Sequence, residues 1–349
     1  MSRRLRLVLS LLVVFSALPL LTAAGNGGDA RSEHQRIVEF WTHERVAQAQ
    51  PRDFVLDPAT RQYRPAAKPP GGPGGGGGGG STVVTGSSWT KGGAIDGSVG
   101  KVLFAMDGSY WVCSATVVND SASGRSIVLT AGHCVYDEAN RAFATNWTFI
   151  PDYDAAPAPL SSSSNAYCDD TLYGCWTAAA LTVHNGYASA GGFNDQAVLY
   201  DWGFAVLGLG GHDPDRLVED VLDAAYSGTG TQSIGFAQQT FGTVGHAFGY
   251  PAAQRYKGND LTYCKGPVDG DPYNADATYR MNGCKMTGGS SGGGWLFGFD
   301  ETTGYGTLFS LNSYGYSGVS AMHGPFFNGF TLATYTAALS TIGNDVVGD

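Results

Sequence analysis

Short runs of β-branched and aromatic residues, separated by clusters of Gly, Ser, Asn and Asp, dominate the chain from residue 81 onward. Runs of this length with turn residues between them predict many short strands, as in an antiparallel sandwich or barrel. A helical pattern is clear only at residues 331–342, where Ala and Leu predict a terminal helix. We therefore predict an all-β body. The expected strands cover residues 101–106, 110–118, 127–129, 147–150, 204–207, 245–250, 294–299 and 307–312.

The first 24 residues have the pattern of an export signal. Three arginines precede an apolar stretch at residues 7–21, and the small residues Thr22-Ala23-Ala24 come directly after it. This stretch of fifteen residues, broken only by Ser10, Ser16 and Pro19, is short for a bilayer span, and signal peptidase accepts small residues at such a site. We expect a signal peptide over residues 1–24 and a secreted, extracellular product. The alternative is an uncleaved anchor.

Residues 25–80 differ in composition from the rest of the chain. Apolar residues recur at roughly helical spacing over 36–50, a basic and Pro-rich stretch continues to residue 70, and residues 71–80 are glycine except for Pro73. Glycine-rich chain is flexible coil. We predict a pro-segment over 25–80 that ends in a linker, in front of a body at 81–349. A permanent N-terminal tail is the alternative.

The net charge of the chain limits the classes of molecule that it is expected to bind. Only 14% of the 349 residues are charged, and the formal net charge is −10. Residues 1–80 carry ten Lys/Arg and six Asp/Glu, whereas residues 81–349 carry ten Lys/Arg and 24 Asp/Glu. Because nucleic-acid affinity comes mainly from cations that displace counterions, the acidic body excludes nucleic acid as an expected partner.

All six cysteines lie in the acidic body. An even number in an oxidising compartment indicates disulfides, although six cysteines allow 15 pairings. No two have the Cys-x-x-Cys spacing of a zinc site, and we expect no metal and no cofactor. Proximity along the chain favours one hypothesis for the pairing: Cys113–Cys134, Cys168–Cys175 and Cys264–Cys284.

One histidine stands in a setting suited to proton transfer. His133 lies in the run Leu-Thr-Ala-Gly-His-Cys at residues 129–134, where small neighbours leave room for a substrate. Imidazole takes and returns a proton near neutral pH. A bridge between Cys113 and Cys134 would tie this loop to a neighbouring strand. A structural histidine is the alternative.

The glycine-rich run at residues 288–295 holds two serines. A nucleophilic serine needs a tight turn and backbone N–H groups directed at the oxyanion. Ser291 has glycine at −2, +1 and +2, whereas Ser290 is followed by serine, so we choose Ser291. Gly289 and Ser291 would supply the two N–H donors of the oxyanion hole. The alternative is a plain glycine-rich linker.

An aspartate is the third residue that this chemistry requires, beside the histidine and the serine. A catalytic imidazole needs a buried acceptor on its second nitrogen. Asp201 leads directly into the apolar run 202–207, whereas the competitors Asp169, Asp170 and Asp195 lead into no strand. We therefore expect a triad of His133, Asp201 and Ser291.

These residues resemble the trypsin/chymotrypsin-like serine protease family. The runs at 129–134 and 289–293 are similar to its histidine and serine motifs, in the family's order, and Gly249-Tyr250-Pro251 is similar to its glutamyl-endopeptidase branch. The resemblance covers roughly 85–340. It implies two antiparallel six-stranded barrels, about 85–215 and 216–349, with the triad between them. It also implies that Ser310 and Asn312 contact the substrate.

Two departures from the family pattern bear on activation and specificity. Ser290 stands where animal members carry the aspartate that pairs with a newly cut N-terminus, so we predict activation without that ion pair and a pro-segment that blocks the cleft or assists folding. Lys285 stands where trypsin-like members carry an aspartate that binds basic side chains. A basic residue before the cut is therefore disfavoured. Lys285, with His323, would favour an acidic one, although Phe309 replaces the histidine of glutamyl-specific relatives and apolar preference remains open.

The expected function is a secreted serine endopeptidase, made as a pro-protein, that hydrolyses protein or peptide substrates through an acyl-enzyme. We expect a monomer without membrane attachment after signal removal. The alternative is a non-catalytic binding module on the protease fold. A metallohydrolase is excluded at His43-Glu44, because residue 47 is alanine where the zinc motif requires histidine.

Overall fold

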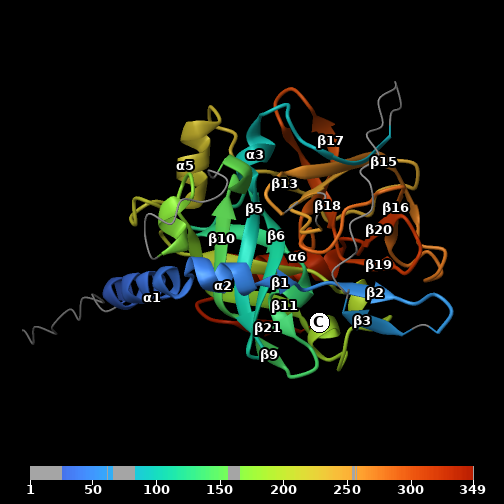
Figure 1. Ribbon diagram of the computed structural model, residues 1–349, viewed down its shortest axis with the longest axis horizontal. Helices are drawn as coiled ribbons and strands as arrows, with labels where there is room; N and C mark the ends of the chain where they lie inside the picture. Colours follow the sequence, from blue (N-terminus) through green and yellow to red (C-terminus); the bar gives the residue numbers. More distant parts are fainter. Residues whose placement is uncertain are drawn as a thin grey trace, which may run out of the picture.

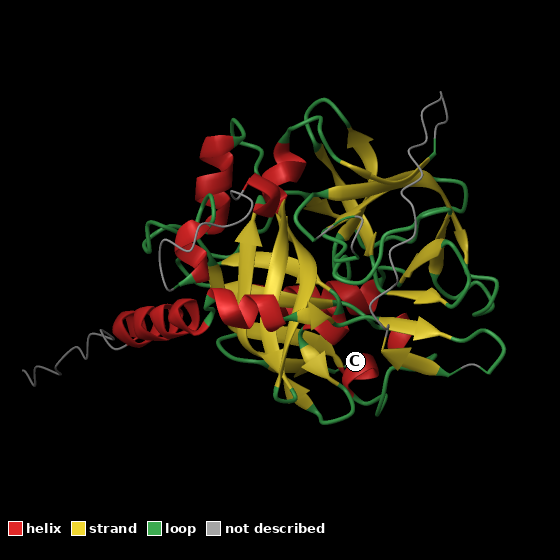
Figure 2. Ribbon diagram, in the orientation of Figure 1, coloured by secondary structure: helices red, strands yellow, loops and turns green. Residues whose placement is uncertain are grey.

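The computed structural model describes residues 26–60, 62–65, 83–155, 166–253, 256 and 258–348. Strands form two sheets that lie side by side, and helices are few and peripheral (Figures 1 and 2). The expected signal peptide at 1–24 and most of the expected linker lie outside the described residues. No helix in the described ranges is long and apolar enough to cross a membrane.

The first sheet closes into a six-stranded antiparallel barrel. Its strands have the order β6-β5-β10-β11-β12-β7, and β7 pairs back onto β6. Most of their residues are buried, because side chains fill the inside of a small barrel while the C-terminal part of the chain covers its outside. The strands are β5 (Val99–Met106), β6 (Ser109–Val118), β7 (Ser126–Thr130), β10 (Thr145–Pro151), β11 (Trp176–His184) and β12 (Gly203–Leu207).

The second sheet has eleven strands among the described residues, and six of them form an antiparallel series in the order β18-β17-β14-β15-β16-β20. No pairing among the described residues joins β18 to β20, so this series is curled rather than closed by hydrogen bonds. The strands are β14 (Val244–Gly249), β15 (Thr262–Gly270), β16 (Tyr279–Asn282), β17 (Gly294–Asp300), β18 (Tyr305–Leu311) and β20 (Ala321–Gly324).

The N-terminal segment runs across both sheets (Figure 1). It begins with α1 (Asn26–Phe40) and α2 (His43–Gln48), which lie on the first barrel. β1 (Gln50–Pro51) then pairs in parallel with β6, and β2 (Phe54–Leu56) pairs in parallel with β19 (Tyr314–Tyr316) of the second sheet. β3 (Tyr63–Pro65) turns back onto β2. Residues 49–56 therefore bridge the junction between the two sheets.

The terminal helix α6 (Gly329–Ser340) is present where Ala and Leu predicted one, and its N-cap is Asn328. It packs on β11 and β12 of the first barrel. The remaining helices are α3 (Ala94–Ser98), α4 (Asn185–Ala188), α5 (Val218–Ala225) and the 3-10 turns η1 (Gly132–Cys134), η2 (Tyr153–Ala155), η3 (Tyr167–Asp170) and η4 (Ala197–Leu199). The remaining strands are β4 (Val84–Ser88), β8 (Tyr136–Asp137), β9 (Ala142–Phe143), β13 (Ser233–Ile234) and β21 (Asp345–Val347).

Three disulfides join Cys113 to Cys134, Cys168 to Cys175 and Cys264 to Cys284. These are the pairs that proximity along the sequence predicted. Each bond closes a loop of 7 to 21 residues, so each restrains local structure rather than the junction of the two sheets.

Candidate active site

His133 lies in η1, immediately after the fully buried strand β7. The Cys113–Cys134 disulfide ties this turn to β6. The imidazole is completely buried, and its Nδ1 lies 2.8 Å from Asp201 Oδ2. The His133 backbone N–H also donates to Asp201 Oδ1 at 2.9 Å. The histidine is therefore held by both its ring and its backbone.

Asp201 precedes β12, as its sequence setting predicted, and is fully buried. Besides the two contacts from His133, its Oδ2 accepts a hydrogen bond from the Ser313 hydroxyl. The next residue, Trp202, donates from Nε1 to Thr334 Oγ1 on α6 at 3.3 Å. A buried carboxylate with three donors is fixed in position and stabilised as the anion that an imidazolium requires.

Ser291 stands in a glycine-rich turn that leads into β17. Its carbonyl accepts a hydrogen bond from Ser114 N at 2.7 Å, which brings the turn against β6 and next to the histidine turn. At Gly292 the backbone has φ +84°, and a Cβ there would lie 2.2 Å from Thr130 Oγ1. Only glycine fits this approach. The structure thus brings the turns of Ser291 and His133 together, although they are far apart in the sequence.

The resemblance implied that Asn312 and Ser310 contact the substrate. Both are fully buried. The Asn312 amide donates to the Phe248 and Ser290 carbonyls at 2.7 and 2.9 Å and accepts from Trp295 Nε1 at 2.7 Å. The Ser310 hydroxyl donates to the Pro325 carbonyl at 2.8 Å. These polar side-chain atoms are bonded inside the protein, so the substrate contacts expected of Ser310 and Asn312 stay a prediction, and the Asn312 amide supports the turn of Ser291.

The side-chain carboxylate of Asp53, a residue of the N-terminal segment, lies at Ser291, where we expect the reaction to take place. The Ser291 hydroxyl donates to Asp53 Oδ1 at 2.6 Å, and Gly289 N donates to Asp53 Oδ2 at 3.1 Å. A Cβ on Gly288 would lie 2.1 Å from Asp53 Oδ2, so glycine at that position leaves the room that the carboxylate fills. Burial raises the pKa of Asp53, and hydrogen bonding to Ser291 and the proximity of His133 partly oppose that increase.

The contact with Asp53 separates the serine from the histidine. His133 Nε2 is buried and has no hydrogen-bond partner among the described residues, because the Ser291 hydroxyl points to Asp53 instead. Phe54 then covers the imidazole edge-on, with ring centroids 5.6 Å apart, and stacks on Phe193 at 4.0 Å. The Asp–His half of the expected triad is assembled, whereas its Ser–His hydrogen bond is not.

Lys285 and His323 were expected to favour an acidic side chain. Lys285 is exposed, and its backbone N–H pairs with the Thr85 carbonyl at 2.9 Å, so its role stays a prediction. His323 is buried between the rings of Tyr314 and Tyr316, and burial lowers its pKa to about 4. Burial therefore favours the neutral imidazole, and the part expected of His323 in specificity stays a prediction.

Cys113, His133 and Cys134 place three ligand-type atoms within 4.8 Å of one another. The two sulfurs are bonded to each other, so they offer no thiolate to a metal ion. This cluster therefore belongs to the disulfide that holds the histidine turn.

Sequence reasoning missed two residues of the site. Ser313 comes right after Asn312 at the end of a buried strand, and this polar pair at a strand end was a usable signal. Asp53 has no such signal, because it is a single carboxylate in a stretch that shows neither periodicity nor a motif.

Comparisons with known proteins agree with this fold. The sequence model of the lysyl endopeptidase C-terminal domain matches residues 83–180. The crystal structure of the protease Anisep from Arthrobacter nicotinovorans is similar, with 34% identity and a TM-score of 0.57 over 74% of this chain and all of that one. The thermostable serine protease AL20 from an extremophilic microorganism has 32% identity and a TM-score of 0.57 over 71% of this chain and 99% of that one.

A glutamyl endopeptidase structure shares the fold, with 17% identity and a TM-score of 0.51 over 74% of this chain and 97% of that one. No curated protein sequence matches the chain. The mostly β architecture, the closed six-stranded barrel and the level of identity to Anisep all point to the same family. This chain belongs to the trypsin-like family of serine proteases.

Proposed function

We propose that this protein is a secreted serine endopeptidase that uses His133, Asp201 and Ser291, and that it is made as a precursor in which residues 26–65 cover the catalytic site. The observation that carries the proposal is the buried His133–Asp201 pair beside a serine turn whose hydroxyl and N–H group both bind a carboxylate. The Gly289 N–H group, which here binds the Asp53 carboxylate, is one of the two N–H groups proposed for the oxyanion, and the Ser291 hydroxyl is the proposed nucleophile.

The proposed chemistry is acyl transfer. Once Asp53 has left, the Ser291 hydroxyl turns to His133 Nε2, which takes its proton as Ser291 attacks the peptide carbonyl. Asp201 holds the imidazole and stabilises its charged form. The N–H groups of Gly289 and Ser291 stabilise the oxyanion, and one such donor contributes about 3–4 kcal/mol in a related site. His133 then protonates the leaving amine, and water hydrolyses the acyl-enzyme in the same way.

Ser313 is a positioning residue in this mechanism. Its hydroxyl binds the same Asp201 oxygen that faces His133 Nδ1, and Ser313 is itself almost completely buried. It therefore acts on the reaction only through the aspartate.

The proposed precursor is latent because of the chemical nature of the group that binds Ser291, the carboxylate of Asp53. The N-terminal segment presents the carboxylate side chain of Asp53 to the hydroxyl, not a backbone carbonyl. A carboxylate is a poor acyl donor, so Ser291 has no peptide bond to cleave at this point. The parallel pairing of β1 with β6 and of β2 with β19 holds the segment on both sides of the nucleophile.

Export is proposed from the signal-like residues 1–24 and the three disulfides, which form and persist in oxidising compartments. The match to the lysyl endopeptidase model does not assign a substrate preference to this chain. The lysyl endopeptidase match ends at residue 180, before the second sheet and before Lys285.

The test is covalent labelling of the processed protein with a fluorophosphonate, combined with mass spectrometry. We expect one modification, on Ser291, and none in Ser291→Ala. The mass of the labelled protein also gives the mature N-terminus. Labelling of Ser290, or no labelling of a processed protein that has kept its fold, would overturn the proposal.

A further inference from the structure

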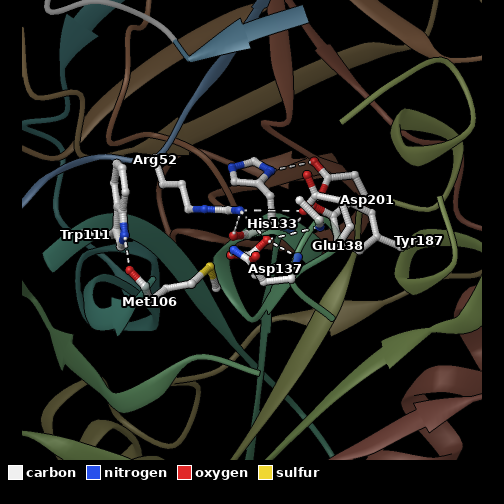
Figure 3. A network of polar contacts seen from close by, with 10 residues as sticks. Arg52, Met106, Trp111, His133, Asp137, Glu138, Tyr187 and Asp201 are labelled. Atoms are coloured by element: carbon white, nitrogen blue, oxygen red, sulfur yellow. Dashed lines mark hydrogen bonds and ion pairs between the residues drawn. The ribbon is translucent and has the colours of Figure 1, made fainter. Parts of the chain in front are cut away.

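Arg52, next to the carboxylate at Ser291, reaches into a buried acidic site beside the catalytic histidine. Its side chain extends below the His133 ring toward Asp137 and Glu138 (Figure 3). The Nη2 atom lies 3.6 Å from Glu138 Oε2 and 4.0 Å from Asp137 Oδ1, and Nη1 donates to the His133 carbonyl. Only 9% of the Arg52 surface is exposed, so the guanidinium is enclosed rather than resting on the surface.

The two carboxylates are also held by hydrogen bonds that do not involve a cation. Asp137, at the end of β8, accepts from Asn140 Nδ2 at 2.8 Å and from the Ala139 and Asn140 N–H groups at 3.1 Å. Glu138 accepts from the Tyr187 hydroxyl at 2.8 Å. Both residues are at least 95% buried. Such an arrangement is a built site rather than a chance group of surface acids.

The positive charge of this site comes from the segment that is expected to leave. Within the described residues, the ion pairs of Asp137 and Glu138 are both with Arg52. Buried carboxylates are costly unless a cation is paired with them. Arg52 enters from the N-terminal segment, so the site opens onto the cleft when that segment is removed, and its two anions then lack their counter-ion.

We propose that Asp137 and Glu138 form a subsite that binds an Arg or Lys side chain of the substrate, within two residues of the scissile bond. The inference rests on the proposed protease function. Arg52 directly precedes Asp53, whose carboxylate binds Ser291, so the subsite lies about one residue from the reacting position. It is distinct from the position of Lys285, which disfavours a basic residue elsewhere in the same cleft.

The first experiment uses the processed wild-type enzyme. A mixed peptide library locates the position at which Arg and Lys are enriched, and two quenched peptides that differ only by Arg or citrulline at that position give a ratio of kcat/KM. Citrulline has the shape of arginine without its charge. We expect a ratio of about 10 to 100, the effect of one charge-assisted hydrogen bond. A ratio near 1, or no enrichment, overturns the proposal.

The second experiment assigns the effect to the carboxylate. Glu138→Gln is expected to bring the Arg-to-citrulline ratio toward 1, whereas Asp213→Asn, which removes an exposed carboxylate elsewhere, keeps the wild-type ratio. An unchanged ratio in Glu138→Gln overturns the proposal. If Glu138→Gln fails to fold, Glu138→Asp serves instead, and it is expected to keep a ratio between the other two.

The same samples separate failure of the subsite from failure of the protease function. Hydrolysis of the library and labelling of Ser291 without basic enrichment reject the subsite alone. A folded, processed protein that shows neither hydrolysis nor labelling rejects both.

Discussion

The carboxylate of Asp53 is the structural cause of the latency that we propose, and its removal can be tested in the intact chain. In Asp53→Ala, the Ser291 hydroxyl loses its acceptor at 2.6 Å and is free to turn to His133 Nε2. The Gly289 N–H group loses its partner at 3.1 Å as well. We expect the precursor to react with a fluorophosphonate much faster than wild type.

The size of the effect is set by these two contacts. A hydrogen bond to a charged group contributes about 1.5–3 kcal/mol, so the closed state loses about 3–6 kcal/mol relative to the open one. Because each 1.4 kcal/mol is a factor of ten, the open fraction of the precursor rises by about 10² to 10⁴. Burial of the Asp53 carboxylate opposes these bonds, as the raised pKa shows, which favours the lower end of this range.

The assay measures the labelling rate of the full-length band, so chain that has already been cut does not contribute. Asp57→Ala is the matched control, because Asp57 lies in the same segment and its carboxylate caps only the nearby Ala59 and Thr60 N–H groups. If Asp53→Ala and Asp57→Ala precursors react as slowly as wild type, the carboxylate is not what restrains Ser291.

Three further outcomes are expected. Ser291→Ala lowers peptide hydrolysis by at least about 10⁴-fold with the circular dichroism spectrum unchanged, whereas Ser290→Ala keeps its activity; the reverse would assign the nucleophile to Ser290. Burial raises the pKa of Asp53, so the closed precursor binds more protons than the open one and closes more tightly as pH falls. The labelling rate of precursor relative to processed enzyme should therefore rise as pH increases through that raised pKa, and Asp53→Asn should show no such rise. Replacing both Cys113 and Cys134 by Ala removes a disulfide and is expected to lower the free energy of unfolding, measured in urea, by about 3 kcal/mol. A loss below about 1 kcal/mol would contradict the restraint that we assign to this disulfide.

Strands with unbroken apolar runs were predictable from the sequence. β12 was expected at residues 204–207 and spans Gly203–Leu207, because a strand buried on both faces leaves a continuous apolar signature. β15 was missed, since Thr262–Gly270 contains Gly, Pro and Lys, and its place is set by pairing with β14, β16 and β4. Such pairing is long-range and leaves no local pattern.

The residues proposed to carry the chemistry were the part of the site with a local sequence signal. His133 and Ser291 stand in runs of small residues, because space and tight turns are needed there, and this need is visible locally. The roles of Asn312 and Asp53 were not visible. The first depends on which carbonyls a buried amide reaches, and the second depends on where a distant segment crosses the cleft.

Under the proposed function, the carboxylate that binds Ser291 also affects how activity begins. The segment across the nucleophile presents no peptide bond to Ser291, so we expect each precursor to be cut by another copy or by a different protease. If another copy makes the cut, activity stays low in a dilute solution, whereas a concentrated solution becomes active after a delay that shortens as active enzyme accumulates.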